Sequence, residues 1–129
     1  MQLEASRDRL LPRIDEAADT PGNREAINHW VGIERWSLDR IRVAQGAPFN
    51  AGGYHPYRLP ETASLIELQG AFRDARAETL ELARQLQRDG FDPSLNIRHN
   101  DLGELTVPEW FEYIDNHTVR EIVRLRGRS

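Results

Sequence analysis

The strongest constraint on the fold is a regular repeat between Leu65 and Leu86. Side chains that are apolar, apart from one threonine, recur three and four residues apart at Leu65, Leu68, Phe72, Ala75, Thr79, Leu82 and Leu86. This period places them all on one face of an α-helix, as in the seam of a helical bundle. Gly90 predicts the end of that helix, because glycine tolerates the left-handed backbone of a C-terminal cap.

Two segments before this helix have the same period. The first is predicted from about Leu3 to Ala18, with a kink or a late start at Pro12, since proline removes a backbone donor and crowds the preceding turn. The second is predicted from about Asn23 to Ala44, and Asn23 is the expected N-cap residue.

A fourth helix is predicted to open at Thr106. The stretch "TVPE" is a capping box, in which Thr106 and Glu109 each accept a hydrogen bond from the other's backbone amide. Pro108 falls in the first turn, where its missing N–H costs little. The inward side of this helix is expected to carry Ile114, Thr118, Glu121, Ile122 and Leu125 among others.

Two long connections separate these helices. Residues 46–61 and 91–105 show neither helical nor strand periodicity, and no strand is predicted anywhere in the chain. The first connection is long enough, when extended, to span a bundle, and would let the second and third helices run parallel. We therefore expect an all-α fold, in one domain over residues 1–129.

Composition excludes several classes of function. The 129 residues carry a net charge of -4, which disfavours a nucleic-acid binder that depends on phosphate contacts. With no cysteine, disulfides, thiolate–zinc sites and a protein thiol nucleophile are absent. The charged N-terminal stretch has no apolar core of a signal peptide, and no apolar run reaches the ~20 residues of a membrane span. We expect a cytoplasmic protein with no membrane or nucleic-acid partner.

The histidines are the main candidates for chemistry. His117 and Glu121 are four residues apart on the predicted last helix, so they lie ~40° apart around it and ~6 Å apart along it. His29 lies on the inward side of the second helix, near Ile33 and Trp36. Three polar groups from two helices can form a metal site in a bundle core. The alternative is a histidine satisfied in the core beside a polar His–Glu pair, which needs no metal.

Two stretches resemble the DinB superfamily. "INHWVGIERWSLDRI" (residues 27–41) is similar to the second helix of that family. "RHNDLGELTVPEWFEYIDNHTVREIVRLRG" (residues 98–127) is similar to its last-helix region, with a histidine, an "LGELT" turn, an "EW" in the first helical turn and a histidine that begins the closing motif. Together they cover about a third of the chain.

The resemblance implies a four-helix bundle in up-down-down-up order, with a long crossover between the second and third helices. It also implies a divalent metal, Zn or Ni, held by three histidines. His29 and His117 match two of them, whereas the third falls on Glu121, where this chain reads "HTVRE". A carboxylate can replace an imidazole as a zinc ligand. Alternatively the third ligand is lost, and Glu121 forms an ion pair with Arg120, Arg124 or Arg40.

Other residues have both a structural and a functional interpretation. His99 matches a recurrent family position and would be a second-layer or acid–base group, or else a residue that caps its turn. Tyr54, His55 and Tyr57 would roof a ligand cavity, or else form an exposed aromatic loop. The tryptophans are expected as core or subunit-interface anchors. These are Trp30, Trp36 and Trp110.

Two functions follow from the resemblance. The first is a metal-dependent S-transferase or isomerase, in which a low-molecular-weight thiol cosubstrate attacks a small electrophile. The second is a non-catalytic bundle with a degenerate metal site, acting as a scaffold or stress-response binding protein and forming a homodimer through an apolar helix face. A nucleic-acid role, suggested by the family's DNA-damage name, is disfavoured by the negative charge.

Overall fold

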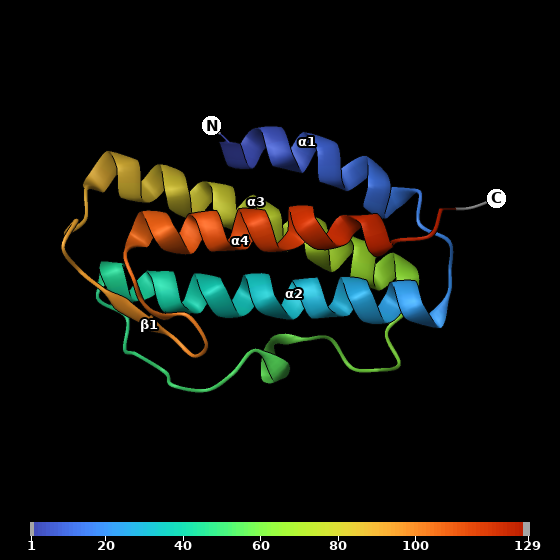
Figure 1. Cartoon of the computed structure of the whole chain (residues 1–129), viewed down its shortest axis with the longest axis horizontal. Coiled ribbons are helices and arrows are strands. Elements are labelled where there is room, and N and C mark those ends of the chain that lie inside the picture. The colour runs from blue at the N-terminus through green and yellow to red at the C-terminus, as the bar shows by residue number, and fades with distance from the viewer. Residues whose placement is uncertain (1, 128–129) are drawn as a thin grey trace.

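The structure, a computed structural model, describes residues 2–127 and is mostly helical (Figure 1). Its four α-helices are α1 (Gln2–Asp15), α2 (Pro21–Ile41), α3 (Leu65–Asp89) and α4 (Val107–Glu121). Short 3-10 turns cover Arg42–Gln45, His55–Tyr57 and Ile122–Arg124. Residues 1 and 128–129 of the predicted domain lie outside the described residues. Within the described part of the chain, no helix combines the length and apolarity needed to cross a membrane.

The predicted C-terminal end of α3 and the predicted start of α4 are confirmed. α3 stops at Gly90, whose φ of 81° lies in the left-handed region. In α4 the predicted capping box is formed, since the Thr106 hydroxyl accepts from the Glu109 amide and the Glu109 carboxylate accepts from the Thr106 amide. The same device at Ser64 and Glu67 begins α3, and the sequence analysis did not use it.

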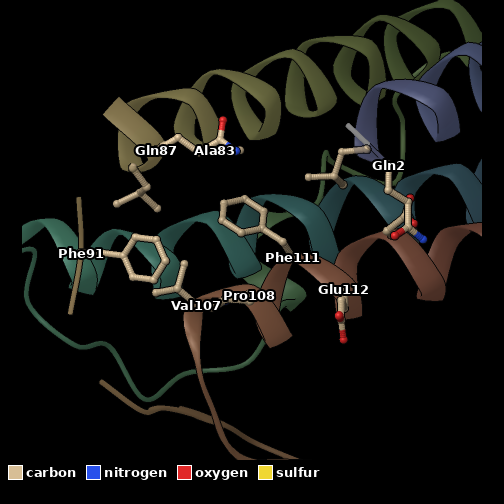
Figure 2. Close-up of a pocket in the computed structure, with 11 residues that line it drawn as sticks. Gln2, Ala83, Gln87, Phe91, Val107, Pro108, Phe111 and Glu112 are labelled. Carbon is tan, nitrogen blue, oxygen red and sulfur yellow. The ribbon is translucent and has the colours of Figure 1, made fainter. Parts of the chain in front are cut away.

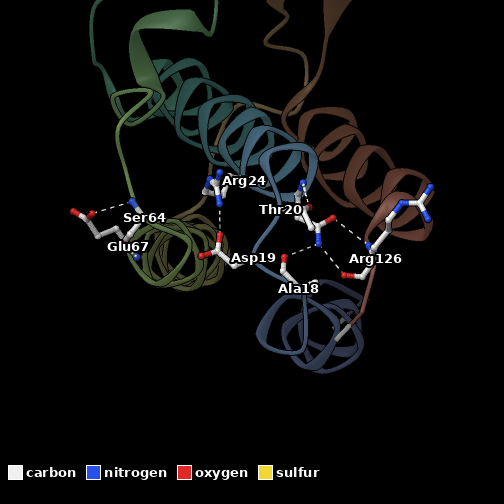
Figure 3. Close-up of polar contacts among 8 residues, drawn as sticks. Ala18, Asp19, Thr20, Arg24, Ser64, Glu67 and Arg126 are labelled. Carbon is white, nitrogen blue, oxygen red and sulfur yellow. Dashed lines mark hydrogen bonds and ion pairs between the residues drawn. The ribbon is translucent and has the colours of Figure 1, made fainter. Parts of the chain in front are cut away.

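The predicted start of α2 is wrong by three residues. Its N-cap is Thr20, whose hydroxyl accepts from the backbone amide of Asn23 at 3.1 Å. Asn23 is instead buried inside the first turn, where its side-chain amide donates to the carbonyls of Ala18 and Arg126 at 2.8 Å each (Figure 3). It also accepts from the Arg126 amide, so Asn23 ties the C-terminal segment to the loop before α2. Pro12 does not delay α1, which begins at Gln2 and continues through the proline.

The helices run in two directions. In Figure 1, α2 and α3 lie side by side and run the same way, while α1 and α4 run the opposite way. The connection between α2 and α3 returns along α2, as the long loop at residues 46–61 predicts. α2 packs against both α3 and α4, and α1 packs against the same two helices.

A β-hairpin departs from the all-α prediction. β1 (Ile97–His99) and β2 (Gly103–Leu105) pair antiparallel within the connection that was predicted as a loop. Each strand has three residues, too few for a period-2 pattern to be seen in the sequence. The hairpin is held to α4 because the indole N–H of Trp110 donates to the Ile97 carbonyl at 3.0 Å.

Two large apolar clusters fill the interior. One surrounds Trp30 and Phe72, and the other surrounds Trp36 and Trp110. All three tryptophans are buried, which confirms the interpretation of these residues as core anchors.

A buried ion pair separates the two clusters. Arg76 of α3 donates through Nε and Nη2 to the two carboxylate oxygens of Glu34 on α2, both at 2.9 Å. The Thr79 hydroxyl donates to the same carboxylate at 2.9 Å. Side-chain exposure is 0% for Arg76 and 1% for Glu34. Burial alone would lower the pKa of Arg76, but the charge of Glu34, its hydrogen bonds and the charge of Asp115 together raise it.

We predict that Arg76→Met destabilises the protein by about 3–5 kcal/mol, because it leaves the Glu34 carboxylate buried without its partner. Adding Glu34→Leu should recover most of this loss, since the carboxylate that lost its partner is then removed as well. Arg73→Met removes the exposed Arg73–Asp15 pair as a matched control and should cost less than about 1 kcal/mol. Urea unfolding measures all three. A loss in Arg76→Met as small as in the control would contradict the role of the pair.

Candidate metal centre

His29, His117 and Glu121 meet between α2 and α4, as the sequence predicts. Each offers one nitrogen or oxygen, and these atoms all lie within 4.8 Å of one another. The Nε2 of His117 is 3.4 Å from one oxygen of Glu121, and the Nε2 of His29 is 3.9 Å from the other. Among the described residues, neither imidazole forms a hydrogen bond to the carboxylate, so all three groups keep free lone pairs.

These distances suit a metal ion better than a direct ion pair. Ligand atoms around a tetrahedral zinc with bonds of ~2.0–2.1 Å are about 3.4 Å apart. The His117–Glu121 spacing has this value, and no other pair of ligand atoms in the group is more than 4.8 Å apart. The residues present therefore fit a divalent metal.

The protonation states also suit a metal. Burial lowers the pKa of both His29 and His117, although the Glu121 charge acts in the opposite direction. Burial by itself would raise the pKa of Glu121, but the hydrogen bond from Trp30 and the nearby His117, His29 and Arg124 lower it. Two neutral imidazoles beside one carboxylate form the donor set of many zinc sites.

Trp30 orients the carboxylate. Its indole N–H, on the helix turn next to His29, donates to Glu121 Oε1 at 2.9 Å. Such an outer hydrogen bond fixes the direction of a metal-binding carboxylate. Of the alternative partners for Glu121, only Arg124 approaches, at 4.0 Å with its side chain largely exposed, whereas Arg120 bonds the Asn116 carbonyl.

Arg40 does not pair with Glu121 and has a role that the sequence analysis missed. It is 1% exposed and donates to the carbonyls of Asn50, Gly52 and Arg98 and to the side chain of Asn100. It thus fastens the crossover loop and the β-hairpin to the end of α2. No local pattern in the sequence indicated this role, because the partners of Arg40 lie 10 to 60 residues away in the chain.

Gly32 lets the crossover loop approach α2 closely, and the sequence analysis missed this residue too. A Cβ at Gly32 would lie 3.0 Å from the Tyr54 ring and 2.6 Å from Arg58. Glycine inside a helix costs about 1 kcal/mol relative to alanine. The close packing of the crossover loop is the reason why this helix has glycine here. With this contact, the Tyr54 ring lies edge-on to His29, with 4.9 Å between centroids.

The other predicted roof residues diverge. His55 is exposed and stacks on Tyr54 at 4.4 Å between centroids, at the edge of a second cleft that borders Glu121. Tyr57 turns away and donates its hydroxyl to Asp39 at 2.8 Å. Of the three predicted roof residues, therefore, only Tyr54 packs directly against one of the candidate ligands His29, His117 and Glu121, which together we call the His–Glu group.

A cavity of about 310 Å³ adjoins the two histidines. It is lined by residues from α2, α4, the crossover loop and the hairpin, among them His29, Tyr54, His99, Tyr113, His117 and Arg120. Burial first, and then nearby acidic and phenolic groups, raise the pKa of Tyr113 to about 12, so its hydroxyl remains a donor at neutral pH.

His99 caps its own turn while lining this cavity. It is 3% exposed, and its Nδ1 accepts from the backbone amides of Asp101 and Leu102 at 3.0 and 3.1 Å. This places the proton on Nε2, which has no partner among the described residues. An Nδ1 with two donors cannot act as a base, so any acid–base role belongs to Nε2.

Comparison with protein-family models, with curated proteins and with solved structures finds no match for this chain.

We predict that stability falls as the pH drops below about 6.5, because burial lowers the pKa of His29, His99 and His117 while the unfolded chain still binds protons at the ordinary histidine pKa. Above that pH these histidines are neutral in both the folded and the unfolded state, so stability does not change. Below it the unfolded chain binds more protons than the folded protein, so the free energy of unfolding decreases. His99→Asn keeps an acceptor for the two amides but cannot titrate. Its unfolding free energy should depend less on pH between about 7 and 5. An unchanged slope would contradict a neutral buried His99.

Proposed function

We propose that this chain is a DinB-like protein whose helices form a four-helix bundle in up-down-down-up order, and that it binds one divalent metal through His29, His117 and Glu121. The observation that supports the site is the convergence of their three ligand atoms within 4.8 Å, without hydrogen bonds between the imidazoles and the carboxylate. The helix directions in Figure 1 support the family.

The donor set favours Zn or Ni among divalent metals. Two imidazoles and one carboxylate suit these borderline ions, and the carboxylate makes the site one unit more negative than a three-histidine site. Three protein ligands leave a position for water or a small ligand. The cavity beside His29 and His117 gives such a ligand room.

The activity we propose is transfer or isomerisation that uses a small thiol cosubstrate. A bound metal would lower the pKa of a thiol on it, which the chain cannot supply itself because it has no cysteine. The chain's own residues would bind and orient the electrophile in the cavity. Tyr54 would cover it with an aromatic face, and Tyr113 and the Nε2–H of His99 would donate hydrogen bonds to it.

The alternative is a non-catalytic bundle that keeps a degenerate site. The buried Nδ1 of His117 supports it, since this atom has no partner among the described residues and metal-binding histidines usually donate through their second nitrogen. In that case the protein would act as a homodimeric scaffold or stress-response binding protein. Homodimer formation and a cytoplasmic location remain predictions under either function.

We predict that Zn²⁺ or Ni²⁺ stabilises the chelator-treated protein by about 2.7 kcal/mol at a metal concentration 100-fold above Kd, measured as a thermal shift. His29→Ala, His117→Ala and Glu121→Gln should each lose this shift. Glu121→His should keep it, because it restores a third neutral donor. His99→Asn, which removes an imidazole from the same cavity but outside the ligand group, is the control and should keep it.

The variants separate the two functions. No stabilisation by Zn²⁺, Ni²⁺ or Mn²⁺ in the unmodified protein would refute the metal site and leave the scaffold. A shift that survives in Glu121→Gln but not in the histidine variants would show that two imidazoles bind metal without the carboxylate.

A further inference from the structure

A second cavity lies away from the His–Glu group. It is bounded by the start of α1, the last turns of α3 and the first half of α4, is open to solvent on one side, and has a volume of about 250 Å³. Figure 2 shows Phe91, Val107 and Phe111 around the space between α3 and α4. Most of its lining is apolar, and Ala83 and Leu86 of α3 contribute to it. An apolar cavity of ~150 Å³ already accepts benzene, so this one has room for a ring with a short chain.

One carboxylate interrupts this apolar lining. Asp115 of α4 lines the cavity and is 3% exposed. Its Oδ1 is buried and has no hydrogen-bond partner among the described residues. A buried carboxylate oxygen without a donor loses its hydration without compensation, which is costly. Asp115 therefore keeps an unused acceptor in the wall of the cavity.

The neighbouring charges leave this carboxylate uncompensated. Arg76 is a buried cation that forms its two side-chain hydrogen bonds with Glu34 through Nε and Nη2, while its Nη1 is buried without a partner among the described residues. Among the described residues, no ion pair within 4.0 Å joins Arg76 to Asp115. At longer range, the Asp115 charge contributes to the raised pKa of Arg76. Glu34 and Arg76 neutralise each other, so their pair leaves no net positive charge for Asp115.

We propose that this cavity binds a small amphiphilic amine, with an aryl or alkyl body against Phe91, Val107 and Phe111 and an ammonium group that donates to Asp115. An ammonium supplies both the missing donor and the missing positive charge. An anion would be repelled by Asp115, and a neutral alcohol would supply the donor without the charge. This binding is independent of the His–Glu group and of the function proposed for it.

The proposal can be tested with three ligands of similar shape and different charge. Phenethylamine, phenethyl alcohol and phenylacetate are titrated into the full chain, and amide chemical shifts are followed by NMR. The amine should bind, with shifts around Leu86, Val107 and Phe111. Because hydrogen bonds to charged groups are the stronger ones, it should bind about 10- to 100-fold more tightly than the alcohol. Phenylacetate should not bind.

Two variants and a control distinguish specific binding in this cavity from nonspecific binding to the surface. Asp115→Asn keeps the shape of the side chain and should abolish the preference for the amine over the alcohol. Ala83→Met fills the cavity and should abolish binding of both. Asp74→Asn removes the same charge from an exposed position of α3 and should change neither.

Several outcomes would overturn the proposal. These are no saturable shifts with the amine up to about 10 mM, equal affinity for amine and alcohol, or a preference that survives in Asp115→Asn. A crystal structure with amine present in which only an ordered water joins Asp115 to Arg76 would do the same. So would a loss of dimers in Ala83→Met, since a second copy would then occupy the cavity.

Discussion

The buried pair of Glu34 and Arg76 is the interaction on which the arrangement of α2 and α3 depends. Both charges lie in the middle of long helices, between the two apolar clusters, and each helix can satisfy its charge only at one register of the other. A slip of one turn would leave both charges buried and unpaired, at a cost of several kcal/mol. The pair therefore specifies how the two helices align.

This alignment has consequences for the His–Glu group. Because α2 and α3 run in the same direction, the connection between them must return along the molecule (Figure 1). Tyr54 of this connection lies against the His29 ring. Arg40 fastens the beginning of that connection, and Gly32 allows Tyr54 to approach. The covering of the candidate metal centre thus follows from helix direction as much as from the residues that form it.

α4 contributes residues to the candidate metal centre and to the apolar cavity through different faces. His117 and Asp115 are two residues apart, which places them ~200° apart around the helix. His117 points toward α2 and the crossover loop, whereas Asp115 lines the cavity beside α1 and α3. The capping box at Thr106 sets where α4 begins, and the burial of Trp110 sets its rotation. A change of either would displace both groups together.

The sequence by itself determined the number of long helices, the C-terminal end of α3, the start of α4, and the pairing of His117 with Glu121. All of these depend on local periodicity and capping, which act within a few residues. The β-hairpin, the true N-cap of α2 and the roles of Gly32, Arg40 and Asn23 were decided by the tertiary structure. The tertiary structure also decided that the Asp115 carboxylate is buried without a partner for its Oδ1. The N-cap and the hairpin are formed by local contacts, but these leave no periodic pattern in the sequence. The roles of Gly32, Arg40 and Asn23 depend on contacts between residues far apart in the chain, such as Asn23 with Arg126 or Arg40 with Arg98. No local pattern encodes such contacts, because a buried polar group finds its partner, or fails to find one, only when the helices have packed.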